Sequence, residues 1–270
     1  MIDIYIFSYN RPMQLDLTIR SIKKFTPYKK IHVLYKADHD YAKGYDKLLQ
    51  IYPDVMFKIE NNFYLDILDI LTGMQSEYIL GLTDDECLIN PVDLSIISEL
   101  QDNATHGINL HLFDSYVSNY TASKNNTKLP IFEKIENDKY IKWNWKDNHK
   151  NSTWGYPYGV AGNIVRRNTY IDICKKRTFR NPNEMESAHT YLTGFGNKMI
   201  AFRECKLINI PVNLVQNVFK NKYGVKFSYT VQDLNKKWLD GYRIKTDNIY
   251  NMPITNDFYN EIKFEFEKCQ

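Results

Sequence analysis

Three consecutive acidic residues form the strongest chemical signal in the sequence. Asp84, Asp85 and Glu86 follow the apolar run 78–82 after one residue, Thr83, and the run reads as a buried strand. Adjacent carboxylates repel one another, and a bound cation relieves that repulsion. Hard divalent ions such as Mn²⁺ or Mg²⁺ bind carboxylate oxygens and keep positions open for phosphate oxygens. The triplet therefore predicts a site for Mn²⁺ or Mg²⁺ made by all three residues, with a solvated acidic turn as the alternative.

A second signal is the polar turn that follows the first apolar run of the chain. Ser8, Tyr9, Asn10 and Arg11 stand there before Pro12. The turn offers an aromatic ring, amide groups and a guanidinium, and arginine both pairs with phosphate and stacks on bases. We predict that it binds a nucleotide, although an ordinary turn has a similar composition. A Gly-rich dinucleotide fingerprint and a phosphate-binding loop with GxxxxGK[ST] spacing are both missing from the sequence.

Elements that could position these residues alternate through 1–113. A proline suits the first position of a helix, and apolar residues recur at helical spacing after Pro12. Strand-like runs cover 2–7, 31–35, 55–59, 77–82 and 108–113, and helical patterns cover 12–25, 41–52, 63–74 and 94–100. Alternation of this kind predicts an α/β fold with a mainly parallel sheet covered by helices on both faces. Such sheets bind ligands at the carboxyl ends of their strands.

The second part of the chain is less regular. The stretch 114–152 is polar and rich in Asn and Lys, and it is longer than a normal connection, so we expect a functional loop or an excursion with its own short strands. Helical patterns return at 169–175, 184–192 and 231–239. We predict one catalytic domain over 1–245, with halves 1–113 and 114–245, and a C-terminal extension over 246–270.

Composition narrows the class of protein. The 270 residues are 43% hydrophobic and 25% charged, which is ordinary for a globular protein and excludes disorder. The net charge of +3 gives little attraction for nucleic acid. The four cysteines are far apart, which suits a reducing compartment. No apolar run is long enough to span a bilayer and no signal peptide is evident, so we expect a cytoplasmic protein with at most a peripheral membrane contact.

The order of the motifs resembles the GT-A class of nucleotide-sugar glycosyltransferases, in particular bacterial enzymes of the family 2 type. A strand, a Ser-Tyr-Asn-Arg-Pro turn, a helix and a later strand ending in an acidic triplet carry the resemblance, together with the segments 35–38, 181–186, 211–217, 234–235 and 241–243. It implies a GT-A-like, mixed and mainly parallel sheet with a Rossmann-like nucleotide-binding half. It also implies that the first turn, Asp38 and Asp84 contact the nucleoside of a UDP- or GDP-type donor, while the acidic motif holds a metal and the diphosphate. The acceptor is then a glycan or a lipid-linked sugar.

The resemblance also implies a catalytic carboxylate. The segment 181–186 reads Asn-Pro-Asn-Glu-Met-Glu and is similar to an N-P-N-x-x-E segment of these enzymes. An inverting transfer needs a carboxylate that takes the proton of the acceptor hydroxyl. Glu186 is the candidate and Glu184 its rival. Two residues so spaced on a helix point in different directions, so both cannot face the same site. Acids at a helix N-terminus that only complement its dipole are the alternative. His189 lies on the same predicted face as Glu186.

An aromatic and Gly-containing stretch is the candidate for contacts with the sugar and acceptor. It contributes Trp154, Tyr156, Gly162 and Asn163, and Gln216 joins them from a later segment. Indole rings stack on sugar faces, but the same aromatics could instead pack the long insertion. Relatives often carry an acid before the glycine where this chain has Ala161, so this segment is expected only to shape the donor and acceptor sites.

Three other classes of protein stay open. A nucleotidyltransferase that makes nucleotide sugars uses a similar sheet, but its Gly-rich first loop is missing here. A non-catalytic carbohydrate-binding protein would suit the aromatic residues but would not need the acidic triplet. A phage-type enzyme that glycosylates DNA bases shares the donor chemistry, and a steep salt dependence of acceptor binding would favour it.

Overall fold

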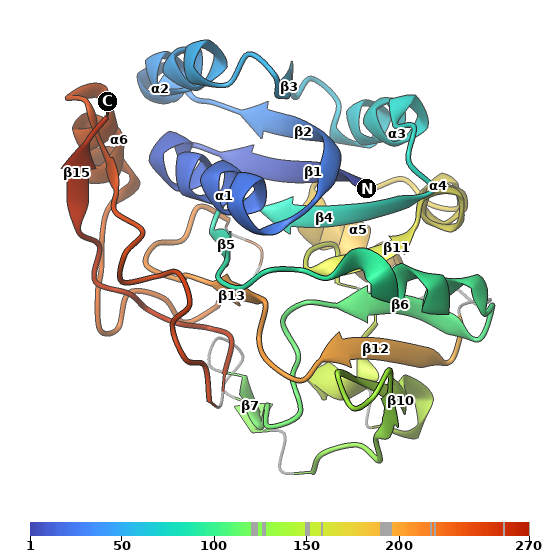
Figure 1. The fold of residues 1–270 in the computed structure, drawn as a ribbon. Coiled ribbons are helices and arrows are strands. Elements are labelled where there is room, and N and C mark those ends of the chain that lie inside the picture. Colours follow the sequence, from blue (N-terminus) through green and yellow to red (C-terminus); the bar gives the residue numbers. More distant parts are fainter. Residues whose placement is uncertain are drawn as a thin grey trace.

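The computed structural model describes residues 1–119, 124–125, 128–148, 152–157, 159–189, 196–216, 218, 220–255 and 257–269. A nine-stranded sheet in the order β3-β2-β1-β4-β11-β6-β12-β10-β9 runs through the molecule (Figure 1). Its strands are β1 Ile2–Tyr9, β2 Tyr28–Lys36, β3 Met56–Ile59, β4 Tyr78–Thr83, β6 Thr105–Asn109, β9 Glu133–Ile135, β10 Tyr140–Asn144, β11 Asn163–Arg166 and β12 Lys198–Phe202. Among these, only β10 and β11 run against the common direction. The predicted mixed, mainly parallel sheet is confirmed.

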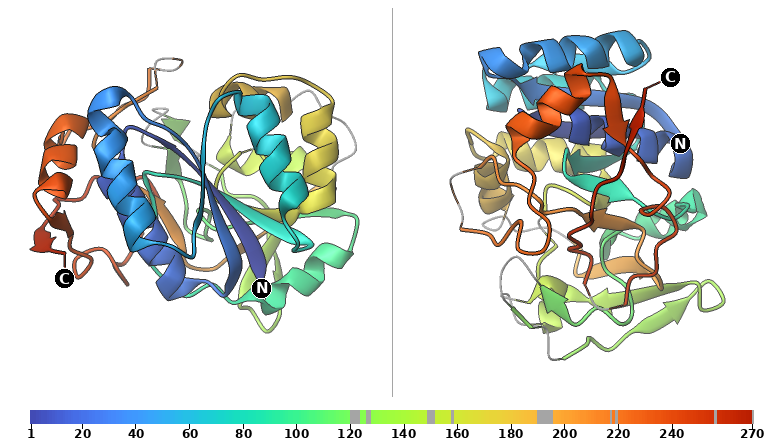
Figure 2. Two further views of the ribbon diagram at one scale, coloured as in Figure 1. Left: turned by 90° about the horizontal axis from the view of Figure 1, so that it is seen from above. Right: turned by 90° about the vertical axis from the view of Figure 1, so that its left-hand side faces the viewer.

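Helices cover both faces of the sheet (Figures 1 and 2). They are α1 Pro12–Phe25, α2 His39–Ile51, α3 Phe63–Gly73, α4 Arg167–Lys175, α5 Pro182–His189 and α6 Val231–Leu239. Side chains alternate along a strand between its two faces, and β1 divides accordingly. Ile4 and Ile6 belong to one hydrophobic cluster with α1 and α2, whereas Tyr5 and Phe7 belong to a second cluster with α3, α4 and α5. The continuous apolar run that sequence analysis detected thus reflects a strand buried on both faces.

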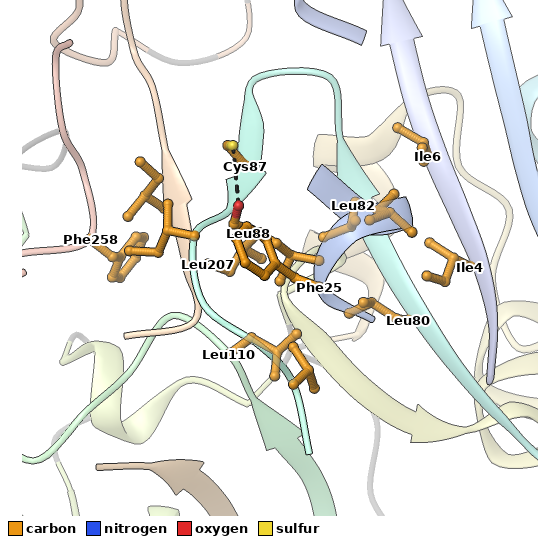
Figure 3. Close-up of a cluster of buried hydrophobic side chains, with 14 of the residues drawn as sticks. Ile4, Ile6, Phe25, Leu80, Leu82, Cys87, Leu88, Leu110, Leu207 and Phe258 are labelled. Atoms are coloured by element: carbon orange, nitrogen blue, oxygen red, sulfur yellow. Dashed lines mark hydrogen bonds between the residues drawn. The ribbon is translucent and has the colours of Figure 1, made fainter. Parts of the chain in front are cut away.

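The first cluster extends well beyond the Rossmann-like half. Leu80 and Leu82 from β4 meet Phe25 at the end of α1, and Leu207 and Phe258 join them from late segments (Figure 3). Cys87, in β5 Glu86–Leu88, lies in the same cluster, and the short strand β13 Leu207–Asn209 pairs with β5. The first cluster therefore joins the beginning and the end of the chain.

The stretch 114–152 contains short strands of its own, which was one of the two outcomes expected for it. β7 Ser118–Asn119 pairs with β8 Lys124–Asn125, while β9 and β10 extend the main sheet. Single 3₁₀ turns follow as η2 Trp145–Asp147 and η3 Thr153–Gly155. The last residues also pack into the domain, because β15 Phe266–Lys268 pairs with β14 Tyr242–Ile244, and α6 with β15 lies beside α1 and α2 (Figures 1 and 2).

Two local predictions differ from the structure. The helical pattern near 94–100 is a 3₁₀ helix, η1 Leu94–Gln101. The strand expected at 108–113 lies earlier in the chain, because β6 begins at Thr105 and ends at Asn109. The Asn109 side-chain oxygen accepts hydrogen bonds from the backbone N–H groups of His111 and Leu112 at 3.0 and 2.7 Å, and this local turn stops the strand. The apolar residues that follow are buried without being part of the sheet.

Among the described residues, no helix is long and apolar enough to cross a membrane.

Candidate active site

A cavity of about 640 Å³ lies at the carboxyl ends of β1 and β4. The chain runs outward from β1 through β2 to β3 and then returns to place β4 on the other side of β1. The strand order therefore reverses between β1 and β4. Ligands of α/β sheets bind in the crevice at such a reversal. The cavity has the size of a typical small-molecule site. The predicted turn and the predicted acidic motif both line it.

Asp84 connects these two motifs. Its carboxylate accepts hydrogen bonds from the Ser8 hydroxyl at 2.9 Å and from the Tyr9 backbone N–H at 3.0 Å. Its own backbone N–H donates to the Phe7 carbonyl at 3.1 Å. Asp84 is 3% exposed, and burial raises its pKa to about 6, although Arg11 and Ser8 favour the ionised form. Asp84 thus fixes the first turn against β4.

Arg11 places a buried positive charge between two acids of the triplet. Its Nη1 lies 3.0 Å from Asp84 Oδ1 and 3.1 Å from Asp85 Oδ2, and its Nη2 donates to the Asn213 carbonyl at 2.7 Å. The two carboxylates raise the pKa of Arg11 and so outweigh the cost of its burial. The guanidinium therefore neutralises part of the charge that the sequence suggested a metal would neutralise.

Asp84 and Asp85 share Arg11 as a partner, whereas the Glu86 carboxylate has partners of its own. Asp85 accepts a hydrogen bond from the Thr83 hydroxyl at 2.8 Å and lines the cavity, with its side chain 19% exposed. Glu86 turns the other way, because Thr83 N–H donates to it at 2.9 Å and His111 Nε2 lies 3.0 Å from it. Within the described part of the chain, no group of three or more His, Cys, Asp or Glu residues is arranged to hold a metal. The expected cluster of three ligands is thus not formed.

Asp85 remains as a candidate metal ligand at the cavity. Magnesium commonly binds to one or two carboxylates together with waters and substrate phosphates. Asp85 meets that requirement, since it lines the cavity and its side chain is partly exposed. Asp84 and Glu86, in contrast, use their oxygens to hold the backbone around them.

The remaining nucleotide-binding candidates form the rim next to the first turn. Asn10 adopts a left-handed backbone conformation with φ of 57°, which asparagine tolerates better than most residues. Its amide donates to Asp38 at 2.8 Å and accepts from the Asp38 N–H at 2.9 Å. The Tyr9 hydroxyl also donates to Asp38, at 3.0 Å. Ser8, Tyr9 and Arg11 line the cavity, whereas Asn10 and Asp38 hold the turn from behind.

The two candidate bases separate as their spacing predicted. Glu186 lines the cavity and accepts a hydrogen bond from the Val160 N–H at 3.3 Å. Burial raises the pKa of Glu186, although a hydrogen bond from Tyr156 works in the opposite direction. Glu184 forms an ion pair with the exposed Arg180 at 2.7 Å and does not line the cavity. The side chain of His189 lies outside the described residues.

The structure places Trp154 in the core and not on a sugar platform. Its side chain is fully buried, and its ring packs on Trp143 at 5.0 Å between centroids and on Phe132 at 5.2 Å. Its indole N–H donates to the Tyr116 carbonyl at 3.3 Å. A sugar cannot reach either face of this ring. The alternative reading, in which the aromatics pack the long insertion, is correct for this residue.

The other acceptor candidates have mixed positions. Gly162 has φ of +74°, and a Cβ atom there would lie 2.4 Å from the His111 ring. Asn163 is buried and donates to the Gly159 carbonyl at 3.0 Å. Both residues shape the turn that brings Val160 and Ala161 to the cavity, without lining it. Gln216 does line the cavity.

Four charged residues that line the cavity were not among the candidates: Lys36, Glu60, Arg180 and Lys222. Glu60 comes directly after β3 and lines the cavity beside Lys36, the last residue of the neighbouring strand β2. The rule that ligands bind at the carboxyl ends of strands was the signal that could have identified Glu60.

Comparison with known proteins gives the following similarities. No protein-family model matches the chain. The chain is 24% identical over 185 residues to the bifunctional glycosyltransferase pgtA of Dictyostelium discoideum, which covers 62% of this chain. The match spans only 24% of the length of that relative. This match agrees with the resemblance to glycosyltransferases.

Solved structures with a related arrangement include S. aureus TarS 1–349 in complex with UDP-GlcNAc. The TM-score is 0.46 at 12% identity, with 77% of this chain and 58% of that chain covered. A second is 4-diphosphocytidyl-2C-methyl-D-erythritol synthase from Anaerococcus prevotii DSM 20548. There the TM-score is 0.43 at 12% identity, with 88% and 96% covered.

Proposed function

We propose that this protein is a glycosyltransferase that moves a sugar from a nucleotide diphosphate donor to a glycan or lipid-linked acceptor. The observation that carries the proposal is the cavity at the carboxyl ends of β1 and β4, where Arg11, Asp85 and Glu186 come together from distant parts of the chain. The match to a curated bifunctional glycosyltransferase supports it independently. Neither the acidic motif nor Glu186 would be needed by a protein that only binds carbohydrate.

The donor would lie along the first turn. Its nucleoside would rest against the Tyr9 ring, and its diphosphate would reach Asp84 and Asp85. Arg11 limits the negative charge that the diphosphate meets there, because its guanidinium lies between the two carboxylates. A UDP- or GDP-type nucleotide sugar fits a cavity of this volume.

Asp85 would hold a Mn²⁺ or Mg²⁺ ion that the donor brings with its phosphates. A divalent ion supplies Lewis-acid stabilisation of the departing nucleoside diphosphate. The chain contributes the orientation of Asp85, which the Thr83 hydroxyl and Arg11 hold from either side.

Glu186 would act as the base of an inverting transfer. A carboxylate takes a proton more effectively when its pKa approaches the working pH. Burial raises the pKa of Glu186 in that direction, and the Val160 N–H holds one carboxylate oxygen in place. The acceptor hydroxyl would approach between Glu186 and the sugar, with Ala161 forming the adjoining wall.

A thermal-shift panel of nucleotide sugars, run with and without Mn²⁺ or Mg²⁺, tests the proposal. A ligand at 100 times its Kd stabilises the folded state by about 2.7 kcal/mol, so a matching donor raises the melting temperature. A donor that binds only with metal supports the full proposal. Binding of nucleoside triphosphates and release of pyrophosphate would instead indicate a nucleotidyltransferase. If only free sugars raise the melting temperature, the protein is a carbohydrate-binding module.

A further inference from the structure

Two charges of opposite sign, on Lys36 and Glu60, lie side by side at one end of the cavity. Tyr35 and Ile59 are partners in the parallel pair β2–β3, so the next residues, Lys36 and Glu60, lie beside each other where these strands end. The Glu60 backbone N–H donates to the Tyr35 carbonyl at 2.7 Å, which fixes this register. Both side chains line the cavity.

Neither charge has a close partner in the described part of the chain. No hydrogen bond or ion pair holds the Glu60 carboxylate or the Lys36 ammonium in the described residues. In contrast, Lys58 of β3 forms ion pairs with Asp66 and Asp69 of α3. Glu60 is half-buried, and burial raises its pKa although the positive charge of Lys36 opposes this. A partly desolvated carboxylate with free oxygens costs free energy unless a ligand supplies hydrogen-bond donors.

The surfaces around the two charges suit a flat ring. Leu34 lies two residues before Lys36 on the same face of the sheet, and Phe7 and Phe63 pack against each other at 5.1 Å beside it. All three line the cavity. The Tyr9 ring adds an aromatic face, with the Lys36 ammonium 5.9 Å from its centre. This end of the cavity therefore combines apolar walls with one acceptor group and one donor group.

The bases of nucleotides differ in what they offer to such a pair. An ionised carboxylate is an acceptor with two oxygens, and an ammonium is only a donor. Guanine presents two adjacent donors, N1–H and the 2-amino group, next to the acceptor O6, so one edge can satisfy Glu60 with both oxygens and Lys36 as well. Uracil presents a single N–H between two carbonyls, which would place acceptors against the carboxylate. Cytosine and adenine offer one amino group next to an acceptor nitrogen.

We propose that Glu60 and Lys36 form a base-selecting pair that makes a guanosine diphosphate sugar the preferred donor. This inference rests on the proposed function, because it uses the same cavity for the same kind of donor. Glu60 would accept from N1–H and the 2-amino group, while Lys36 would donate to O6.

Calorimetric titration of the wild-type protein tests the preference without any substitution. The probes are GDP, IDP, UDP, CDP and ADP, each with Mg²⁺ present. A bidentate pair between a side chain and a base discriminates by about 1–3 kcal/mol, which is about 5- to 150-fold in Kd. We expect GDP to bind tighter than UDP by a factor in that range. IDP, which lacks the 2-amino group, should fall between them. Tighter binding of UDP or CDP would overturn the inference while leaving the proposed function intact, and failure of every nucleotide to bind would remove both.

The variant Glu60→Gln then assigns the preference to its residue. It replaces one acceptor oxygen by a donor group, which suits the edge of guanine less and the edge of uracil more, so the ratio of GDP to UDP affinity should fall by about 5-fold or more. The control is Glu77→Gln, the same change on an exposed glutamate at the opposite end of β4. An unchanged ratio in Glu60→Gln would overturn the assignment.

Discussion

Replacement of Arg11 by methionine tests how the buried charges of the site are balanced. The change keeps apolar volume but removes the guanidinium from Asp84 and Asp85 and leaves the Asn213 carbonyl without its donor. Breaking a buried ion pair typically costs about 3–5 kcal/mol. Asp84 keeps two other hydrogen-bond donors, and Asp85 lies at the cavity surface where water can reach it. We therefore expect a loss near the lower end, about 3 kcal/mol at pH 8.

The pH dependence of this loss has a definite sign. Burial raises the pKa of folded Asp84 from 3.8 to about 6, and removal of the neighbouring Arg11 raises it further. A carboxyl group with a raised folded pKa destabilises the protein above that pKa, and the penalty disappears as the pH falls toward its unfolded value. The difference in free energy of unfolding between Arg11→Met and wild type should therefore be smaller at pH 5 than at pH 8.

Urea denaturation at both pH values measures the effect. For a chain of 270 residues, about 3 kcal/mol corresponds to about 5 °C in melting temperature. The control is Arg20→Met, which removes another largely buried arginine, paired with Asp16 at 2.9 Å and remote from the cavity. Both variants should lose stability, but only Arg11→Met should also weaken nucleotide binding, by about 1–3 kcal/mol. A loss below about 1 kcal/mol at pH 8, or a loss that grows on acidification, would refute this reasoning.

Four further substitutions have expected outcomes. Glu186→Gln should lower kcat by about 10²–10⁴-fold with little change in donor affinity, whereas Glu184→Gln should change kcat little; single-turnover assays of both variants decide which one faces the acceptor. Gly162→Ala places a Cβ atom against the His111 ring at a positive φ, so thermal denaturation should show a loss of more than about 1 kcal/mol. Trp154→Ala should cost about 3–5 kcal/mol in urea denaturation, because the indole is fully buried; a stable variant that has lost only sugar affinity would contradict its assignment to the core.

Local patterns in the sequence predicted the elements well where the signal itself is local. α1 begins at Pro12 and ends at Phe25, because proline suits a first helical position and the apolar spacing continues to that residue. The helix at Val231–Leu239 also agrees with its apolar pattern, and its N-cap Thr230 accepts a hydrogen bond from the Asp233 N–H at 3.0 Å. The site at the carboxyl ends of the strands followed from the alternation of strands and helices.

Partners distant in sequence account for what could not be predicted. The acidic triplet looked like one cluster of metal ligands, but the distant Arg11 holds the carboxylates of Asp84 and Asp85 together, whereas the distant His111 lies beside the carboxylate of Glu86. An isolated sequence cannot show which side of an aromatic residue is covered, so Trp154 read equally well as a platform and as core. Glu60 passed unnoticed because a single acid after a short strand carries no pattern of its own.

The central claim is that the cavity transfers the sugar of a nucleotide diphosphate donor, and product analysis by ³¹P NMR tests it most directly. The protein would be incubated with Mg²⁺ or Mn²⁺ and each nucleotide sugar in turn, with and without a mixture of glycan and lipid-linked acceptors. We predict that one donor yields its nucleoside diphosphate, that acceptor accelerates the release, and that Glu186→Gln abolishes the acceleration. The claim would be contradicted if all nucleotide sugars stay intact while a parallel incubation with a nucleoside triphosphate and a sugar phosphate releases pyrophosphate.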